Sequence, residues 1–266
     1  NNQTGTIRFY GTPAEEGGSG KVYMARDGLF DDVDVVLHWH PSSQNHARPR
    51  TSNSNKSAKF SFEGISAHAA GAPDKGRSAL DGVESMNMMV NLMREHMPQD
   101  SRIHYVITKG GLAPNVVPDE AEVYYYVRHP KRQMVEKLFN RVVKAAKGAA
   151  MGTETTVSFE VIHGNYSLMP NDTLQKIMHE KLSARGGVTY SSKENKFANT
   201  IYKTLLSPTA QVGDQEKVLS YKPTHGHGST DVGDVSWLVP TAGLRISTWV
   251  PGTAAHSWQA VAAGGT

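Results

Sequence analysis

The sequence lacks cysteine entirely, in a chain of 266 residues. This absence excludes disulfide bonds and thiolate metal ligands, so any metal would have to be bound by histidine, aspartate or glutamate. It weakly favours a reducing compartment, and we therefore expect a cytoplasmic protein, although secretion is also compatible with the composition. The chain has 12 histidines and 25 acidic residues, which supply many candidate ligands.

Long apolar runs and clusters of one charge are also missing. No run approaches the roughly 20 apolar residues of a membrane span, and we expect neither a span nor a signal peptide. Lysine and arginine are scattered and the formal net charge is only +3, which argues against a nucleic-acid partner. The chain starts with Asn1-Asn-Gln-Thr4 and stops at Gly264-Gly-Thr266, so we expect an excerpt of a longer polypeptide without a closing helix.

Two adjacent acids, Glu15 and Glu16, are the most informative feature that is present. They follow the alternating stretch Thr6–Tyr10, which predicts a strand, and they precede the glycine-rich Gly17-Gly-Ser-Gly-Lys21. Neighbouring carboxylates at the exit of a strand point in different directions, so one can bind a metal while the other moves a proton. A solvated acidic turn is the alternative. The glycine-rich stretch departs from a phosphate-binding loop, because Val22 replaces Ser/Thr after Lys21.

The middle of the chain predicts a module of its own between residues 51 and 166. Apolar residues at three- and four-residue spacing predict helices from Arg77 to His96 and from Pro130 to Ala149. Predicted strands cover Lys59–Phe62, Arg102–Thr108, Glu120–Val127 and Thr155–Ile162. The order β-α-β-β-α-β is the split βαβ pattern of a ferredoxin-like sandwich.

The segments on either side predict one discontinuous α/β domain, residues 1–50 and 167–266. The expected elements are a helix at Lys21–Asp27, a strand at Val33–His40, a polar linker at Pro41–Lys56, helices at Asn171–Ala184 and Lys193–Leu205, a turn at Thr224–Asp231, a strand or helix at Val235–Val239 and a strand at Gly243–Thr248.

Several histidines stand where they could bind a metal or a substrate. Alternation along a strand places His38 and His40 on one side, although a satisfied structural histidine is the commoner explanation for either. His68 lies in the small-residue turn Ser66-Ala-His-Ala-Ala70, and His256 follows another small-residue loop. The alternative for His68 is a turn histidine without a role.

Polar residues on rigid or flexible loops are candidates for substrate binding. Asn115 lies in Gly110-Gly-Leu-Ala-Pro-Asn-Val-Val-Pro118, whose glycines and prolines restrict it, and its amide could bind a carboxylate or an oxyanion. Arg128 ends a predicted strand and could pair bidentately with a carboxylate, or with nearby surface acids. His227 and Asp231, in the His225–Asp231 turn, could bind substrate or metal or belong to a simple loop.

As an ordered set, these motifs resemble the M20 family of metallopeptidases and amidohydrolases. The resemblance rests on Pro13-Ala-Glu-Glu-Gly17, Trp39-His40, Ser66–Ala70, Gly110–Pro118 and His256-Ser257. It is greatest for the aminoacylase/aminobenzoyl-glutamate hydrolase branch, to which Gly228–Trp237 is similar, and it runs through nearly the whole chain.

The resemblance implies a hydrolase that cleaves the amide bond of an N-acyl amino acid or an aminobenzoyl-glutamate-like substrate. It implies a two-metal site with Zn or Mn, in a catalytic domain interrupted by a ferredoxin-like lid that forms a homodimer. Glu15 would be the general base, and Glu16, His40 and His256 would be metal ligands. His68 would reach the active site of the partner subunit, Asn115 would contact substrate, and Arg128 would lie near a substrate carboxylate.

One departure from the family pattern concerns the metal ligands. The family's early His-x-Asp or Cys-x-His ligand pair would precede residue 1, so the chain by itself could be inactive. Two alternatives therefore stay open, a non-catalytic dimerising or ligand-binding fragment and a related dipeptidase with a cationic or β-amino substrate.

Overall fold

The protein, as a computed structural model that describes residues 4–264, consists of two compact units. The first unit combines the N-terminal residues up to Leu29 with Ser52–Leu168 and His227–Asp234. The second combines Phe30–Thr51, Met169–Gly226 and the residues from Val235 onward. The domains expected from the sequence, 1–50 with 167–266 and 51–166, remain a prediction. They differ from the units because the residues up to Leu29 and His227–Asp234 pack with the central segment.

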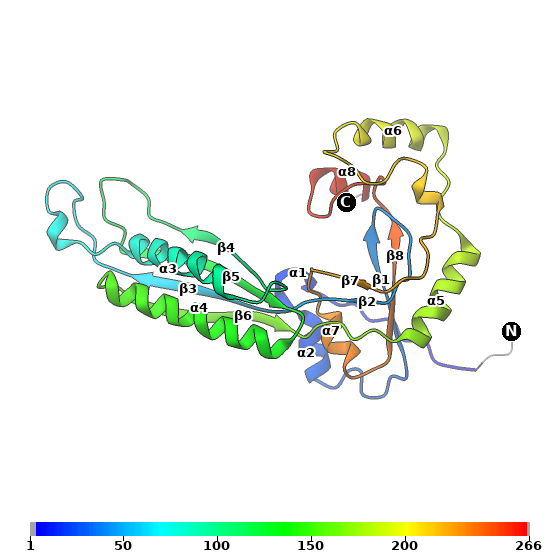
Figure 1. Cartoon of the computed structure of the whole chain (residues 1–266), viewed down its shortest axis with the longest axis horizontal. Coiled ribbons are helices and arrows are strands. Elements are labelled where there is room, and N and C mark those ends of the chain that lie inside the picture. The colour runs from blue at the N-terminus through cyan, green and yellow to red at the C-terminus, as the bar shows by residue number, and fades with distance from the viewer. Residues whose placement is uncertain (1–3, 265–266) are drawn as a thin grey trace. The chain divides into compact units, whose positions relative to one another are not determined.

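An antiparallel sheet of four strands forms the centre of the first unit (Figure 1). Its strands are β3 (Ser54–Glu63), β4 (Arg102–Lys109), β5 (Glu120–His129) and β6 (Thr156–Asn165), in the order β4-β5-β3-β6. The expected strands are confirmed, and β3 starts at Ser54 rather than at Lys59. Alternation along β5 buries Val123, Tyr125 and Val127 and turns Tyr126 and Arg128 to the other face.

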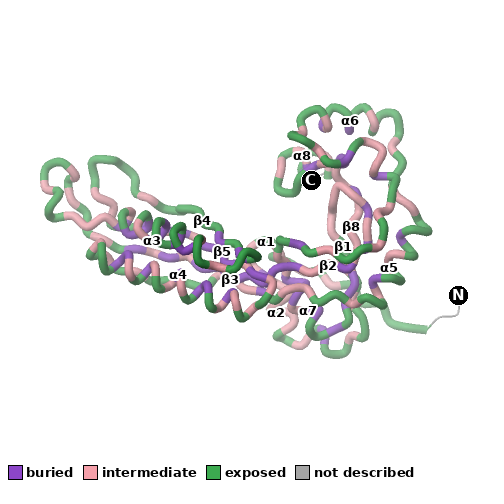
Figure 2. The backbone as a smooth tube through the Cα atoms, in the orientation of Figure 1, coloured by how far each residue is buried: buried purple, intermediate pink, exposed green. Residues whose placement is uncertain are grey.

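Helices α3 (Ala79–Met93) and α4 (Arg132–Gly152) lie side by side against this sheet (Figure 1). The side chain of Ser78 caps α3 by accepting from the Asp81 N–H at 3.1 Å. The apolar stripes of both helices enclose the main core with the inner face of the sheet, visible as the buried strip in Figure 2. Two short 3₁₀ turns, Pro73–Lys75 and Arg94–His96, flank α3.

The N-terminal part of the first unit differs from the expectation. Residues 4–14 form no strand, so the strand predicted at Thr6–Tyr10 is wrong. Ile7 and Phe9 are 100% and 95% exposed, and alternation alone does not form a strand without a partner for its backbone. The helix expected at Lys21–Asp27 is confirmed as α2 (Gly20–Arg26), preceded by the short α1 (Glu15–Gly18).

The second unit is built around two parallel strands. β1 (Val36–Ser42) pairs with β8 (Thr241–Ser247), and a shorter pair joins β2 (Arg50–Thr51) to β7 (Thr224–His225). The helices are α5 (Asp172–Arg185), α6 (Ser192–Tyr202) and α8 (Trp258–Gly264), with a 3₁₀ turn at Asp214–Glu216. The stretch Val235–Val239, expected as a strand or a helix, holds only the end of helix α7 (Val232–Ser236), and a turn follows it. Asn171 caps α5 by accepting from the Leu174 N–H at 3.1 Å, and α8 contradicts the expectation that no helix closes the chain.

The stretch Pro41–Lys56 is not the linker that its polar composition predicts, because several of its polar residues are buried. Asn45 is 1% exposed and donates to the carbonyl groups of Gln215 (2.7 Å) and Lys217 (3.1 Å). Ser54 is fully buried and donates to the Asn165 carbonyl at 2.7 Å. Buried polar side chains that hydrogen-bond to backbone groups stabilise a fold. Composition alone does not show whether a polar stretch is buried in this way or exposed to solvent.

Within residues 4–264, no helix combines the length and the apolar character needed to cross a bilayer.

Candidate active site

The Glu15–Glu16 pair lies in a tight turn rather than at the exit of a strand. Glu16 and Gly17 leave the helical conformation inside α1, with φ/ψ of −77/96 and 87/−4. Two residues with side chains, Ala14 (φ 56) and Ser19 (φ 53), adopt the left-handed conformation at either end. Glu15 is half-buried and Glu16 is exposed, and the division of roles expected for the two carboxylates stays a prediction. Non-glycine residues in this conformation are uncommon, and the surrounding structure must hold them there.

An ion pair within the first unit fastens the residues that follow this turn. The Asp231 side chain is fully buried, and it accepts from the Lys21 backbone N–H at 2.9 Å and from Lys21 Nζ at 3.0 Å. Both carboxylate oxygens are therefore engaged by Lys21. In this arrangement Asp231 holds the start of α2, and its expected role in substrate binding stays a prediction.

Arg128 lies on the outer face of β5, near the turn. Its guanidinium carbon is 5.2 Å from the centre of the Tyr126 ring, and its Nε is buried without a hydrogen-bond partner among the described residues. Burial lowers the pKa of Arg128, while Tyr126 and Glu16 act in the opposite direction. A half-buried guanidinium with an unused N–H is suited to binding a carboxylate.

Three residues of this region were missed by the sequence analysis. Tyr126 lies beside the turn, since a β-carbon placed on Gly17 would be 3.8 Å from its hydroxyl oxygen. His163, on β6, has its Nδ1 3.0 Å from Ser19 Oγ and its Nε2 3.3 Å from Tyr126 Oη. Strand alternation, which places Tyr126 on the face of Arg128, could have found the tyrosine. No local signal points to Ser19 or His163.

His68 and Asn115 are brought together, but at the opposite end of the sheet. The Ala69 N–H donates to the Asn115 carbonyl at 3.0 Å, and His68 Nδ1 accepts from the N–H groups of Ala70 (3.2 Å) and Gly71 (3.0 Å). Arg128 is paired with Asn55 at the start of β3, whereas the His68 loop follows Glu63 at its end. At about 3.4 Å per residue of antiparallel strand, roughly 27 Å separate the two groups.

The histidines expected at the site are found in separate places. His38 and His40 share one side of β1 as expected, with the exposed Leu37 and Trp39 on the other. His40 Nδ1 lies 2.6 Å from the Pro41 carbonyl oxygen and 3.0 Å from Arg245 Nη1. His256 is exposed and left-handed (φ 57) in the second unit.

His227 belongs to the first unit. Its side chain is exposed, and its carbonyl accepts from Asn53 Nδ2 at 2.9 Å.

The expected metal ligands are of the right chemical type but do not form a complete site. One carboxylate and imidazoles are ligands that Zn and Mn both accept. Glu16 belongs to the first unit, and His40 and His256 belong to the second. Across residues 4–264, no three histidine, aspartate or glutamate side chains converge as a metal site would require. The roles of these residues as ligands therefore stay predictions.

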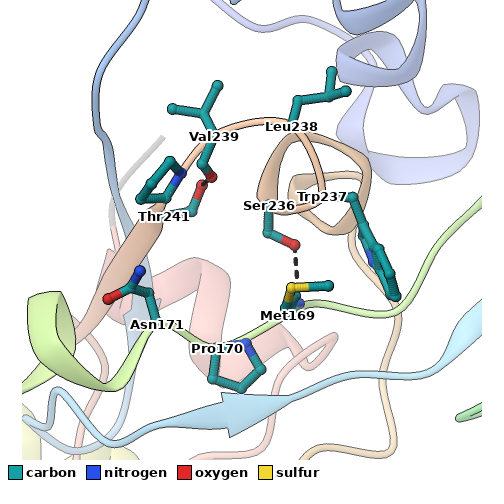
Figure 3. A pocket seen from close by; sticks show the side chains of 9 residues that line it. Met169, Pro170, Asn171, Ser236, Trp237, Leu238, Val239 and Thr241 are labelled. Atoms are coloured by element: carbon teal, nitrogen blue, oxygen red, sulfur yellow. Dashed lines mark hydrogen bonds between the residues drawn. The ribbon is translucent and has the colours of Figure 1, made fainter.

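A cavity of about 220 Å³ in the second unit is not part of this chemistry. It is lined by Met169–Asn171 and Ser236–Thr241, and Figure 3 shows Trp237, Leu238 and Met169 around it. The Met169 N–H donates to Ser236 Oγ at 2.9 Å across one side (Figure 3). None of the lining residues carries a side chain that titrates near neutral pH. The cavity therefore lacks the acid–base groups of a hydrolytic site.

Known proteins are similar in sequence to the central segment and to nearly the whole chain. Residues 51–154 match the M20 peptidase dimerisation domain. The chain is 41% identical over 290 residues to one of the subunits of p-aminobenzoyl-glutamate hydrolase from Escherichia coli (strain K12), covering 99% of this chain and 60% of that protein. It is 31% identical over 232 residues to the Xaa-Arg dipeptidase of Mus musculus, covering 86% and 47% respectively. The chain thus spans less than two thirds of either relative.

A solved structure shares the fold. The aminobenzoyl-glutamate utilization protein from Klebsiella pneumoniae superposes with a TM-score of 0.59 over 89% of this chain and 56% of that one, at 19% identity. The sequence matches cover the motifs on which the resemblance rests, and the dimerisation domain coincides with most of the expected inserted module. Residues 51–154 thus match the M20 peptidase dimerisation domain, and nearly the whole chain is similar in sequence to a subunit of p-aminobenzoyl-glutamate hydrolase.

Proposed function

We propose that the protein containing this chain is a metal-dependent amidohydrolase that cleaves an N-acyl amino acid or a p-aminobenzoyl-glutamate-like substrate. One observation carries the proposal: the turn that carries Glu15 and Glu16 and the half-buried guanidinium of Arg128 both lie beside Tyr126 in one unit. The Tyr126 ring is 5.2 Å from the Arg128 guanidinium, and its hydroxyl is beside the backbone of the Glu15–Glu16 turn. A proton-moving group and a carboxylate-binding group are what hydrolysis of such a substrate needs.

In this proposal Arg128 binds the carboxylate of the amino-acid half of the substrate. Its buried Nε–H has no acceptor among the described residues, so a substrate carboxylate would relieve an unsatisfied donor. Arginine binds a carboxylate through two parallel hydrogen bonds, which orients the substrate as well as holding it. The identity of 41% with a p-aminobenzoyl-glutamate hydrolase chain supports a substrate with such a carboxylate.

Glu15 acts as the general base. It takes a proton from the water that attacks the amide carbonyl, and the same proton then goes to the departing nitrogen as the C–N bond breaks. The products are a carboxylic acid and a free amino acid. Bound divalent metal ions, Zn or Mn, would polarise the substrate carbonyl and make the attacking water more acidic. Their proposed ligands are Glu16, His40 and His256.

We further propose a homodimer formed through a ferredoxin-like lid at residues 51–166. The dimerisation-domain match at residues 51–154 supports it. The roughly 27 Å of strand between Arg128 and the His68 loop makes a shared site within one subunit impossible for these side chains. A twofold dimer would let His68 and Asn115 of one subunit serve the site of the other.

A dipeptidase is the second candidate, favoured by the 31% identity to an Xaa-Arg dipeptidase. A dipeptidase also hydrolyses an amide bond, but in a different substrate. Comparing the hydrolysis of p-aminobenzoyl-glutamate with that of Xaa-Arg dipeptides therefore distinguishes the two candidate functions. A non-catalytic binding fragment is the remaining alternative. It would bind fewer metal ions than a hydrolase and turn over neither substrate.

The experiment measures hydrolysis of p-aminobenzoyl-glutamate with Mn or Zn by the 266-residue chain and by a polypeptide extended to the relatives' length. We expect turnover in the extended form and a roughly 10²–10⁴-fold loss in Glu15→Gln, the usual contribution of a general base. Glu180→Gln, at an exposed position of α5, is the matched control and should leave turnover unchanged. Full activity in Glu15→Gln, or no turnover of either substrate by the extended polypeptide, would contradict the proposal.

A further inference from the structure

Ser19 is an unexpected residue in the glycine-rich turn after Glu15 and Glu16. Gly17, Gly18 and Gly20 surround it, yet Ser19 itself has a left-handed backbone (φ 53) and is only 3% exposed. Glycine adopts this conformation without steric cost, whereas serine does not. A serine held at such a position, where its neighbours are glycines, suggests that its hydroxyl group is needed.

The hydroxyl of Ser19 contacts His163, a residue 144 positions later in the chain. The two atoms, Ser19 Oγ and His163 Nδ1, are 3.0 Å apart. The other ring nitrogen of His163 lies 3.3 Å from Tyr126 Oη, and the two rings meet edge to face at 5.4 Å between centres. Burial, followed by the charge of Arg128, lowers the pKa of His163. The neutral ring then donates through one nitrogen and accepts through the other.

Tyr126 connects this contact to the sheet. The Tyr124 hydroxyl donates to Tyr126 Oη at 3.4 Å, and Ser57 Oγ on β3 lies 3.3 Å from Tyr124 Oη. Burial, with the Tyr124 hydrogen bond, raises the pKa of Tyr126 to about 12, so its hydroxyl stays protonated and can donate. A continuous set of polar contacts thus runs from the rigid sheet to the turn that carries Glu15 and Glu16.

We propose that Ser19 and His163 are positioning residues for the hydrolytic reaction. Through the Ser19–His163–Tyr126 contacts, the first unit's sheet holds the turn so that Glu15 stays in the orientation that proton transfer needs. Neither residue has to touch the substrate. A displacement of the general base by about 1 Å lowers the rate on the order of 10²-fold, so a contact that holds the base in place preserves the rate. This inference rests on the function proposed above.

The first test compares two substitutions of Ser19 in the extended, metal-supplemented protein. Ser19→Gly removes the hydroxyl while relieving the backbone, and Ser19→Ala removes it while keeping the left-handed strain. We expect kcat to fall about 10–100-fold in both, with KM changed less than about threefold. Ser183→Ala is the matched control, because Ser183 Oγ also lies near a histidine nitrogen, His179 Nε2 at 3.5 Å, on α5. It should leave kcat unchanged.

The second test separates the two ring contacts of His163. The amide of asparagine can replace Nδ1, which faces Ser19, whereas the longer glutamine can replace Nε2, which faces Tyr126. His163→Asn keeps the contact to Ser19, which holds the turn directly, and loses the contact to Tyr126. We therefore expect it to retain more of kcat than His163→Gln, which should lose as much as Ser19→Ala. The double variant Ser19→Ala/His163→Gln should lose no more kcat than either single variant, because both substitutions break the same Ser19–His163 contact. Additive losses, or full kcat in Ser19→Gly, would overturn the inference.

A readout on the metal-free protein distinguishes this inference from the proposed function. We expect the ¹⁵N chemical shifts of the His163 ring to report one tautomer in the unmodified protein and a changed tautomer balance in Ser19→Gly. Unchanged ring shifts in Ser19→Gly would contradict the contact even if the enzyme is active. Conversely, failure of the unmodified protein to hydrolyse any amide would refute the proposed function. Changed ring shifts in Ser19→Gly would then still support the contact between Ser19 and His163.

Discussion

At the scale of single residues, buried polar groups distinguish this structure from what composition suggests. Asn45 uses both ends of its amide, since its Oδ1 also accepts from the Ser247 N–H at 2.8 Å. His46, the next residue, is joined to Arg245 by a pair of backbone hydrogen bonds of 3.0 and 2.8 Å. Such residues contribute to stability because their polar groups are satisfied inside the protein.

His46 predicts a pH dependence of stability. Burial, followed by the charges of Arg48, Arg245 and Arg50, lowers the pKa of His46 to about 4 from 6.5. The unfolded state therefore binds a proton before the folded state does, so stability is complete above pH 6.5 and falls as the pH drops towards 4. The full loss is at most about 3 kcal/mol.

Urea unfolding between pH 7 and 4 measures this loss. We expect His46→Gln to flatten the pH dependence across that window, while His96→Gln, at an exposed histidine, should leave the slope as it is. Equal slopes in all three proteins would show that His46 does not carry the effect.

At the scale of elements, periodicity was a reliable guide where helix and sheet pack on each other. The stripes that predicted α3 and α4 are the residues that contact β3 and β5. Alternation failed at Thr6–Tyr10, where no neighbouring strand pairs with the backbone in the described structure. An element forms where its apolar face and its backbone are both satisfied, and the sequence pattern reports only the first condition.

Helix α3 approaches β3 closely at Gly82, so adding a methyl group there should change the stability of the protein. A β-carbon on Gly82 would lie 2.5 Å from Phe62 Cδ1, inside the main core. We expect Gly82→Ala to destabilise the protein by about 1–3 kcal/mol, despite the better helix propensity of alanine. The measurement is the free energy of unfolding in urea.

Gly148 of α4 provides the matched control. A β-carbon there would meet only Met89, with the nearest atom, Sδ, at 3.8 Å, which is ordinary contact. Gly148→Ala should therefore stabilise the protein by about 0.5–1 kcal/mol through helix propensity alone. If both alanines stabilise equally, the packing of α3 against Phe62 is looser than the structure indicates.

At the scale of the whole molecule, the main finding is that the residues expected at the site are divided between the two ends of one sheet. Arg128 and the Glu15–Glu16 turn share one end, and His68 and Asn115 share the other. A rigid antiparallel sheet with two helices packed on it cannot fold back to join its ends. The proposed dimer resolves the separation because a second copy can present its own loop.

Mixing two inactive variants tests whether His68 acts in the partner subunit. We expect Glu15→Gln and His68→Ala homodimers of the extended protein to be inactive, and mixed dimers to contain one complete site. Random mixing of twofold dimers would restore about a quarter of the unmodified activity. If His68 acts within its own subunit, mixing restores nothing. Exchange of subunits is verified with differently tagged copies, so that absence of recovery is informative.

The sequence by itself determined the element order of residues 54–165 and the family resemblance. These depend on periodicity and on short motifs, which are local along the chain. Only the tertiary structure decided that Ser19 meets His163, that Lys21 pairs with Asp231, and that Arg128 lies far from His68. The first two contacts join residues more than a hundred positions apart, for which neighbouring residues carry no signal. The third depends on strand register, which is set by the packing of the whole sheet.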